Sequence, residues 1–150
     1  MDESVPSTKE RMAFPDPQSE RWEPLLDAAW AAWARAYAPY SGFRVGAAIR
    51  LNSGEIVTGA NVENVSYGLT ICAERSAVSR AVTQFGPEIH IEAIAVANLN
   101  GASSPPCGAC LQVLAEFSLP DAPVIFSISD GERVVSFHEL LPLAFEMKTK

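Results

Sequence analysis

The sequence predicts an α/β fold, a three-layer α/β/α sandwich built on a mixed five-stranded sheet. Three observations support this prediction. The chain has 150 residues, which suits a single domain. Helix-like and strand-like segments follow one another in the order α-β-β-α-β-α-β-β-α. One strand-like segment, residues 89–97, is a nearly continuous apolar run, which is typical of a strand with both faces buried.

The first predicted helix begins at Ser19, a residue type suited to the N-cap, and runs to about Tyr37 before Pro39 ends it. Apolar side chains recur within it at spacings of three and four: Trp22, Leu25, Leu26, Ala29, Trp33 and Tyr37. This spacing gives the helix one apolar face, so we expect it to pack against other elements along that face.

The other predicted elements are bounded by glycine, proline and turn residues. In chain order they are strands over 43–51 and 55–62, a helix over 71–85, the strand over 89–97, a helix over 107–117, strands over 124–129 and 134–135, and a short helix over 137–141. The turns Asn52-Ser53-Gly54 and Asp130-Gly131 join the first and last strand pairs.

Residues 1–18 differ in composition from the rest of the chain. They hold three prolines and several charges with little periodicity, which predicts a disordered N-terminal arm at 1–18 and one folded domain at 19–150. The arm lacks the apolar core of a secretory signal, and no apolar run reaches the roughly 18 residues that span a bilayer. We therefore expect a cytoplasmic protein without a membrane partner.

The charge balance disfavours a long nucleic-acid partner. The formal net charge is −7 and the pI is about 4.8. Proteins that bind DNA or RNA normally cluster lysine and arginine to neutralise phosphates. Here the eleven basic residues are scattered along the chain. We therefore expect no long nucleic-acid partner.

Three cysteines, Cys72, Cys107 and Cys110, lie near the starts of the two predicted central helices. A small, odd number of cysteines is not typical of a disulfide framework, and clustered thiols in a reducing compartment more often serve metal or redox chemistry. Zinc binds thiolates well, and a helix start carries a partial positive charge that favours them. The sequence therefore predicts a Zn²⁺ cofactor on three cysteines, with the fourth coordination position open, as in catalytic sites.

Glu74 and Arg75 follow Cys72 closely enough to act beside the metal. Zinc in an open site lowers the pKa of a bound water to about 7, and Glu74 can carry a proton there without binding the metal. Three thiolates and Zn²⁺ together carry a net negative charge, which weakens the Lewis acid. We expect Arg75 to hydrogen-bond the thiolates and offset that charge.

Other interpretations of these residues remain open at this point. The cysteines could be buried core thiols, since cysteine behaves as a small hydrophobe. A structural zinc would need a fourth ligand, for which His90 and His138 are the only histidines, and neither has finger-like spacing. Arg75 could be a solvated helix charge.

The chain resembles the small homotetrameric zinc-dependent cytidine deaminase family. The likeness extends from about Tyr37 to Phe145 through the segments AYAPYSGFRVGAAI, GANVENVSYGLTICAERSAVSRAV, PPCGACLQVLAEF and ELLPLAF, in the family's order. It implies that 19–150 is one catalytic domain with Cys72, Cys107 and Cys110 as zinc ligands. Glu74 is implied as the proton shuttle, the non-ligand glutamate of zinc deaminases.

The resemblance also implies a nucleoside pocket and a shared active site. Asn61 and Glu63 are implied to hydrogen-bond the ribose hydroxyl, Phe43 to pack beside the base or sugar, and the backbone at Ala73 to read the pyrimidine edge. Tyr67 and Phe145 resemble residues that reach into a neighbouring subunit's site, which implies a homo-oligomer, the tetramer of the family. The alternatives are turn chemistry for Asn61 and Glu63, and ordinary packing for Phe43, Tyr67 and Phe145.

Two positions depart from the family pattern. Leu111 stands where the family commonly has arginine after P-C-x-x-C, and Pro105 stands where serine or threonine is more usual before it. The first change removes a basic group near the metal-bearing helix. The second lies near the expected exit of the leaving amine, so we hypothesise tolerance of altered N4 substituents on the base.

The predicted reaction is the hydrolysis of cytidine or 2′-deoxycytidine to uridine or 2′-deoxyuridine with release of ammonia. The first rival is a blasticidin-type aminonucleoside deaminase, which the Asn61-Val62-Glu63-Asn64 motif disfavours. The second is a deaminase of cytosine in RNA or DNA, which the net charge disfavours. The third is a zinc-stabilised binding module without enzymatic activity, which would need a closed four-ligand site and no Glu74.

Overall fold

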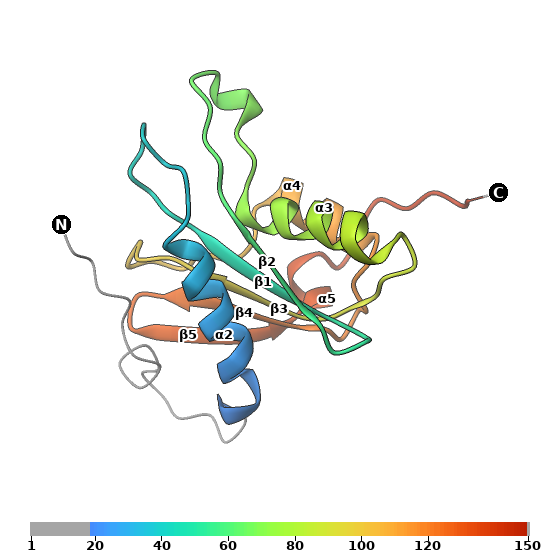
Figure 1. Ribbon diagram of the computed structural model, residues 1–150. Helices are drawn as coiled ribbons and strands as arrows, with labels where there is room; N and C mark the ends of the chain where they lie inside the picture. Colours follow the sequence, from blue (N-terminus) through green and yellow to red (C-terminus); the bar gives the residue numbers. More distant parts are fainter. Residues whose placement is uncertain (1–18, 150) are drawn as a thin grey trace.

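The computed structural model describes residues 19–149 (Figure 1). The predicted N-terminal arm, 1–18, lies outside the described residues. Among those described, no helix combines the length and apolar character needed to cross a membrane.

A single sheet of five strands forms the centre of the fold, in the order β2-β1-β3-β4-β5. The strands are β1 (Gly46–Leu51), β2 (Ile56–Ala60), β3 (Ile91–Ala97), β4 (Pro123–Ile128) and β5 (Gly131–Ser136). Strand β1 pairs antiparallel with both β2 and β3, β3 pairs parallel with β4, and β4 pairs antiparallel with β5. The prediction of a mixed five-stranded sheet is confirmed.

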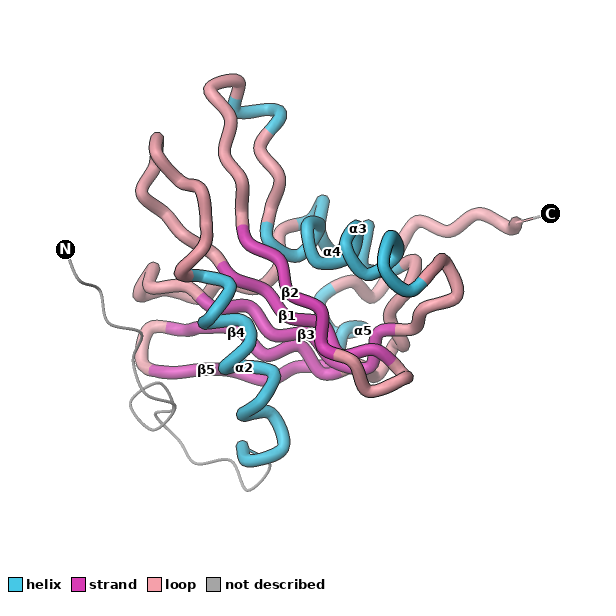
Figure 2. The backbone as a smooth tube through the Cα atoms, in the orientation of Figure 1, coloured by secondary structure: helices cyan, strands magenta, loops and turns pink. Residues whose placement is uncertain are grey.

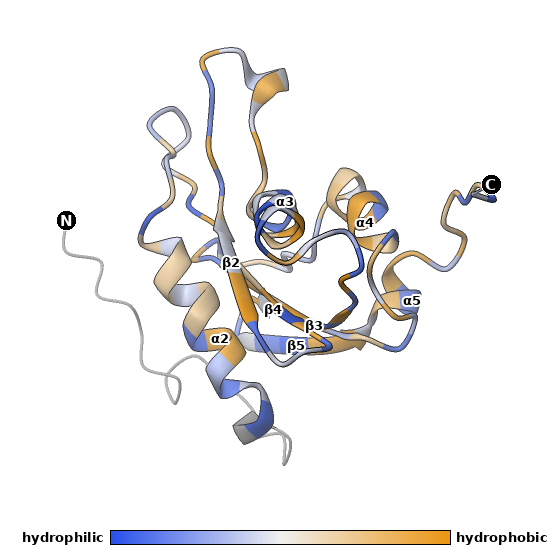
Figure 3. Cartoon of the chain, turned by 45° about the vertical axis from the view of Figure 1, so that its right-hand side comes forward, coloured by the Kyte–Doolittle hydropathy of each residue, from blue (hydrophilic) through white to orange (hydrophobic). Residues whose placement is uncertain are grey.

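Helices cover both faces of the sheet. Helix α2 (Ser19–Trp33) packs on one face, and α3 (Ala73–Phe85), α4 (Gly108–Ala115) and the short α5 (Phe137–Leu140) lie on the other (Figure 3). Each face has its own apolar core. This arrangement is the predicted α/β/α sandwich.

Most of the apolar face predicted for helix α2 is buried, so that part of the prediction is confirmed. Trp22, Leu25, Leu26, Ala29 and Trp33 are buried, and Trp30 joins them. The prediction was wrong for Tyr37, because the helix ends at Trp33 and Tyr37 is 54% exposed. The backbone of Tyr37 instead forms a bridge with Val62, which draws the chain out of the helix and beside the segment after β2.

Two long loops extend beyond one edge of the sheet (Figure 2). The first joins α2 to β1. The second joins β2 to α3 and contains the one-turn 3₁₀ helix η1 (Tyr67–Leu69). The bridge between Tyr37 and Val62 ties these loops together at their bases. Strand β2 is therefore shorter than the predicted 55–62, because Val62 pairs outside the sheet.

Candidate metal centre and active site

The sheet topology places the starts of α3 and α4 at the same edge. Strands β2 and β3 are both antiparallel to β1, so they run parallel to each other. Helix α3 follows β2 and α4 follows β3, so both helices begin at the carboxyl ends of parallel strands. Ligand sites in α/β sheets lie at this edge.

A glycine allows α3 to approach the sheet closely at this edge. A Cβ atom at Gly59 would lie 2.3 Å from the carbonyl oxygen of Ala73 and 2.4 Å from the backbone nitrogen of Ala77. No other residue fits beneath the first turn of α3 without moving it. Gly59 therefore determines where Cys72, at the start of that helix, is held.

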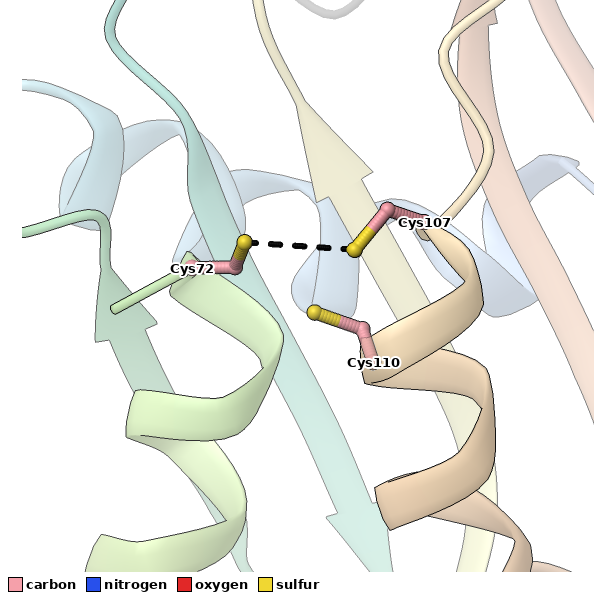
Figure 4. Close-up of side chains that lie close together, drawn as sticks. All are labelled: Cys72, Cys107 and Cys110. Carbon is pink, nitrogen blue, oxygen red and sulfur yellow. Dashed lines mark hydrogen bonds between the residues drawn. The ribbon is translucent and has the colours of Figure 1, made fainter. Parts of the chain in front are cut away.

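The three cysteines converge between the two helix starts (Figure 4). Cys72 is the N-cap of α3, Cys107 is the N-cap of α4, and Cys110 lies in the first turn of α4. Their Sγ atoms all lie within 4.8 Å of one another, with Cys72 and Cys107 4.0 Å apart. The positive ends of two helices therefore face the thiol cluster, and they favour its ionised form.

This donor set fits zinc. A tetrahedral ion with Zn–S bonds of about 2.3 Å places its sulfur ligands about 3.8 Å apart, close to the separation of Cys72 and Cys107. Among residues 19–149, the three cysteines form the one group of three or more potential ligands, and no histidine joins it. Neither His90 nor His138 belongs to this group, so the described residues form no site that a histidine closes.

Glu74 is a buried carboxyl beside the thiols. It is 5% exposed, and its Oε2 lies 3.6 Å from the Sγ of Cys110, which donates to it. Burial raises the pKa of Glu74 above its ordinary value, and the negative charge of Cys72 adds to the shift. A carboxyl with a raised pKa can both accept and donate a proton near neutral pH.

The thiols of Cys72 and Cys110 have opposite pKa shifts. The hydrogen bond from Cys110, together with the guanidinium of Arg75, lowers the pKa of Cys72 to about 5. The same hydrogen bond and burial raise the pKa of Cys110. Cys72 is therefore a thiolate at neutral pH, whereas Cys110 retains its proton until a cation displaces it.

Arg75 contacts the cluster at Cys72. Its Nη2 lies 3.6 Å from the Sγ of Cys72 and donates to the carbonyl oxygen of Thr70 at 3.3 Å. The carbonyl fixes the guanidinium so that its charge faces the thiolate. Arg75 is therefore not simply a solvated helix charge, because its guanidinium contacts a potential metal ligand.

We expect Arg75→Gln to weaken zinc binding about 10- to 100-fold, the usual effect of losing a group that supports a ligand. Without the guanidinium the pKa of Cys72 rises, so protons compete with zinc more strongly and zinc is lost at a higher pH than in the wild type. Zinc titrations at several pH values measure this. Arg75→Lys, which keeps the charge but not the planar fork, should fall between the two. Equal zinc affinity in Arg75→Gln and the wild type would contradict the expectation.

A cavity of about 400 Å³ opens beside the cysteines. Three of the residues implied for nucleoside binding line it, namely Phe43, Asn61 and Glu63, together with Cys72, Cys107 and Glu74. Ala73 is fully buried and is not part of the lining. Tyr67 and Phe145 are 68% and 70% exposed and lie outside this cavity, and Phe145 lines a different one near the C-terminal segment.

Sequence reasoning missed part of the wall of this cavity. Thr70, Val96, Asn98, Asn100, Ser103 and Ser104 also line it, next to Pro105. Most of these follow β3, and the rule that ligands bind beyond the carboxyl ends of parallel strands could have pointed to them. Leu111 is buried in the core under α4 and does not line the cavity.

Asn61 and Glu63 are engaged with the loop that carries Phe43. Asn61 donates from Nδ2 to the carbonyl oxygen of Phe43 at 2.9 Å and accepts at Oδ1 from the N–H of Val45 at 2.8 Å. Glu63 accepts from the hydroxyl of Ser41 and from the backbone N–H of Tyr40. The Ser41 hydroxyl is the main cause of a lowered pKa at Glu63, so its carboxylate is ionised.

We expect Asn61→Ala to lower the free energy of unfolding by about 1–3 kcal/mol, because a backbone donor and a backbone acceptor lose their buried partner. The loop bearing Phe43 would then loosen, so KM should rise as well. Chemical denaturation and steady-state kinetics measure the two effects. Val134→Ala, at an exposed position on β5 outside the cavity, is the control. Unchanged stability in Asn61→Ala would show that these two hydrogen bonds do not hold the loop.

Comparison with known proteins identifies the family of this site. The profile described as "Cytidine and deoxycytidylate deaminase zinc-binding region" matches residues 19–126. The chain belongs to this family. The match contains all three cysteines and Glu74. The Zn²⁺ cofactor predicted from the sequence is therefore confirmed.

Individual relatives carry the same name over most of their length. The chain is 43% identical to cytidine deaminase of Halalkalibacterium halodurans over 122 residues, which cover 81% of this chain and 91% of the relative. It is 43% identical to cytidine deaminase of Mycobacterium tuberculosis, covering 83% and 89%. A crystal structure of cytidine deaminase from Burkholderia pseudomallei superposes with a TM-score of 0.75 at 45% identity, covering 81% and 97%.

Proposed function

We propose that this protein is a cytidine deaminase that hydrolyses cytidine and 2′-deoxycytidine to uridine and 2′-deoxyuridine, releasing ammonia. The observation that carries the proposal is the buried carboxyl of Glu74 held 3.6 Å from Cys110, beside three convergent thiols and a nucleoside-sized cavity. The names of the family and of its relatives give the substrate class.

The chemistry divides between the metal and the chain. Cys72, Cys107 and Cys110 would hold the zinc ion, which would supply the Lewis acidity that activates water for attack on C4 of the base. Glu74 accepts one proton of that water and delivers it to N3 as the oxygen bonds to C4. Glu74 then carries the proton of the new C4 hydroxyl to the exocyclic nitrogen, the C4–N4 bond breaks, and ammonia leaves with C4 as a carbonyl. Because burial raises its pKa, the Glu74 carboxyl can be reprotonated within each cycle. The hydrogen bond from Cys110 and the guanidinium of Arg75 together lower the pKa of Cys72 to about 5.

We assign recognition of the sugar to the side of the cavity formed by the segments before β1 and after β2. In this proposal Asn61 and Glu63 hydrogen-bond a ribose hydroxyl, Phe43 packs beside the base or sugar, and the backbone at Ala73 reads the pyrimidine edge. The ionised Glu63 is a strong acceptor for a hydroxyl. A free base has no sugar hydroxyl to donate to Glu63, which favours nucleosides over free cytosine.

The proposal includes a homotetramer with shared active sites, in the cytoplasm, without nucleic-acid or membrane partners. Tyr67 and Phe145 would complete a neighbouring subunit's pocket. The large exposed fractions of both rings support this, as do Val65 and Leu69, which are 78% and 66% exposed on the same loop as Tyr67. Sedimentation equilibrium tests it, and a monomer that deaminates cytidine fully would refute the shared site.

The direct test is the ultraviolet change when zinc-loaded protein is mixed with cytidine. We expect conversion to uridine and release of one ammonia per cytidine. A zinc-loaded protein that leaves cytidine unchanged would overturn the proposal. The same assay with blasticidin then decides for or against the aminonucleoside rival.

Pro105 lines the cavity where the family more often has serine or threonine, so we propose that the protein also accepts substituents on N4. We expect N4-methylcytidine to be converted to uridine with release of methylamine, at a kcat/KM about 10- to 100-fold below that of cytidine, the range that one added carbon typically costs in a pocket. Chromatography of uridine measures it. Failure on every N4-substituted cytidine, with good turnover of cytidine, would refute this tolerance.

A further inference from the structure

The loop that follows β3 forms a polar wall of the catalytic cavity. Within it, the N–H of Asn100 donates to Oδ1 of Asn98 at 3.1 Å, and Nδ2 of Asn100 donates to the hydroxyl of Ser104 at 2.7 Å. The N–H of Ser104 donates to the carbonyl oxygen of Ser127 on β4 at 2.9 Å. These bonds tie the loop to itself and to the sheet, so the wall is held in place before a ligand binds.

Asn98 is the buried polar side chain of this wall. It is 4% exposed and lines the cavity. Because Oδ1 accepts from a backbone N–H, the orientation of the amide is defined, and Nδ2 is the free end. Within residues 19–149 no residue accepts a hydrogen bond from this Nδ2. A buried amide donor normally has a partner, and Asn98 lines the cavity, so its Nδ2 is available to a ligand there.

The register of the sheet places Asn98 toward the sugar-binding side. Ala97 pairs with Gly46 on β1, so Asn98 lies across from Val45, the residue whose N–H is held by Asn61. Side chains alternate along a strand, so Val96 and Asn98 face the same side, and both line the cavity. Asn98 therefore approaches the cavity from β3, next to the segment that Asn61 organises.

We propose that Asn98 is a specificity-determining residue whose Nδ2 donates a hydrogen bond to a sugar hydroxyl of the bound nucleoside. The inference rests on the proposed function, which places N3 and C4 of the base at Glu74 and the thiols. The proposed function also assigns the sugar to Asn61, which binds the N–H of Val45, so the sugar hydroxyls are the acceptors expected on the Val45 side of the cavity. A site built to hydrogen-bond a hydroxyl discriminates against the analogue that lacks it, because the buried donor is left unpaired.

The test compares zinc-loaded wild type and Asn98→Ala on cytidine and on its 2′-, 3′- and 5′-deoxy derivatives. We expect Asn98→Ala to lower kcat/KM for cytidine by about five- to tenfold, the usual effect of one neutral hydrogen bond. With one of the three deoxy derivatives, the one lacking the bonded hydroxyl, wild type and variant should be equally active. Such selectivity identifies the hydroxyl and excludes a purely structural effect, which would lower all four rates alike.

Two further variants keep the test decisive. Leu99→Ala, in the same loop but outside the cavity lining, is the matched control and should act on all four substrates like the wild type. If Asn98→Ala fails to fold, Asn98→Asp replaces it, because its carboxylate can still accept from the N–H of Asn100. Equal losses on all four substrates, or no loss on cytidine, would overturn the inference. An inactive wild type would overturn the proposed function first.

Discussion

Glu74→Gln should fold and bind zinc but deaminate cytidine at about one thousandth of the wild-type kcat, within the range that a general acid–base group contributes. The glutamine has the same shape, so the packing around this 5%-exposed position is kept. It cannot carry the proton from water to the base, which is the one function the substitution removes. Steady-state kinetics with zinc analysis of the same samples measures both quantities.

Two variants separate the loss of the carboxyl from a general loss of charge. Glu88→Gln removes an exposed glutamate outside the cavity and should leave kcat unchanged. Glu74→Asp keeps a carboxyl but withdraws it by one methylene, so an intermediate kcat is expected. If Glu74→Gln kept more than about a tenth of the wild-type kcat, far above the range for a lost proton shuttle, the proposed role would be wrong.

Much of this site could be predicted from the sequence, because its groups are close together along the chain. Cys107 and Cys110 lie on one helix turn, and Glu74 is two residues from Cys72. The exact helix starts were less predictable. Both central helices begin one or two residues later than predicted, because Cys72 and Cys107 serve as N-caps, a position where Ser, Thr, Asp and Asn are the usual signals.

Features that depend on contacts between distant segments were not predictable. The 3.6-residue periodicity continues to Tyr37, yet its backbone pairs with Val62 and leaves the helix. The polar wall around Asn98 has no periodic signal, because side-chain to backbone bonds within the loop determine its conformation. The departure at Leu111 could be noted from the sequence, but only the structure places that side chain in the core.

Removal of zinc by a chelator under reducing conditions should lower the free energy of unfolding by about 4 kcal/mol, if free zinc had been present at about a thousand times its dissociation constant. For a chain of this size that corresponds to a fall in Tm of about 8–16 °C. The reason is that the ligands come from two helices, α3 and α4, which only the folded chain brings together. Calorimetry of the zinc-loaded and chelated protein measures the difference.

Zinc binding should release protons, so the stabilisation by zinc should depend on pH. Cys72, with its pKa lowered to about 5, has no proton to lose at neutral pH, whereas Cys110, with its pKa raised, must lose one. Zinc affinity should therefore rise with pH through neutrality, and calorimetry in buffers of different ionisation enthalpy should detect the proton. Cys107→Ser should abolish the stabilisation by zinc, whereas His90→Ala and His138→Ala should keep it. Zinc loss in either histidine variant would instead indicate a closed structural site.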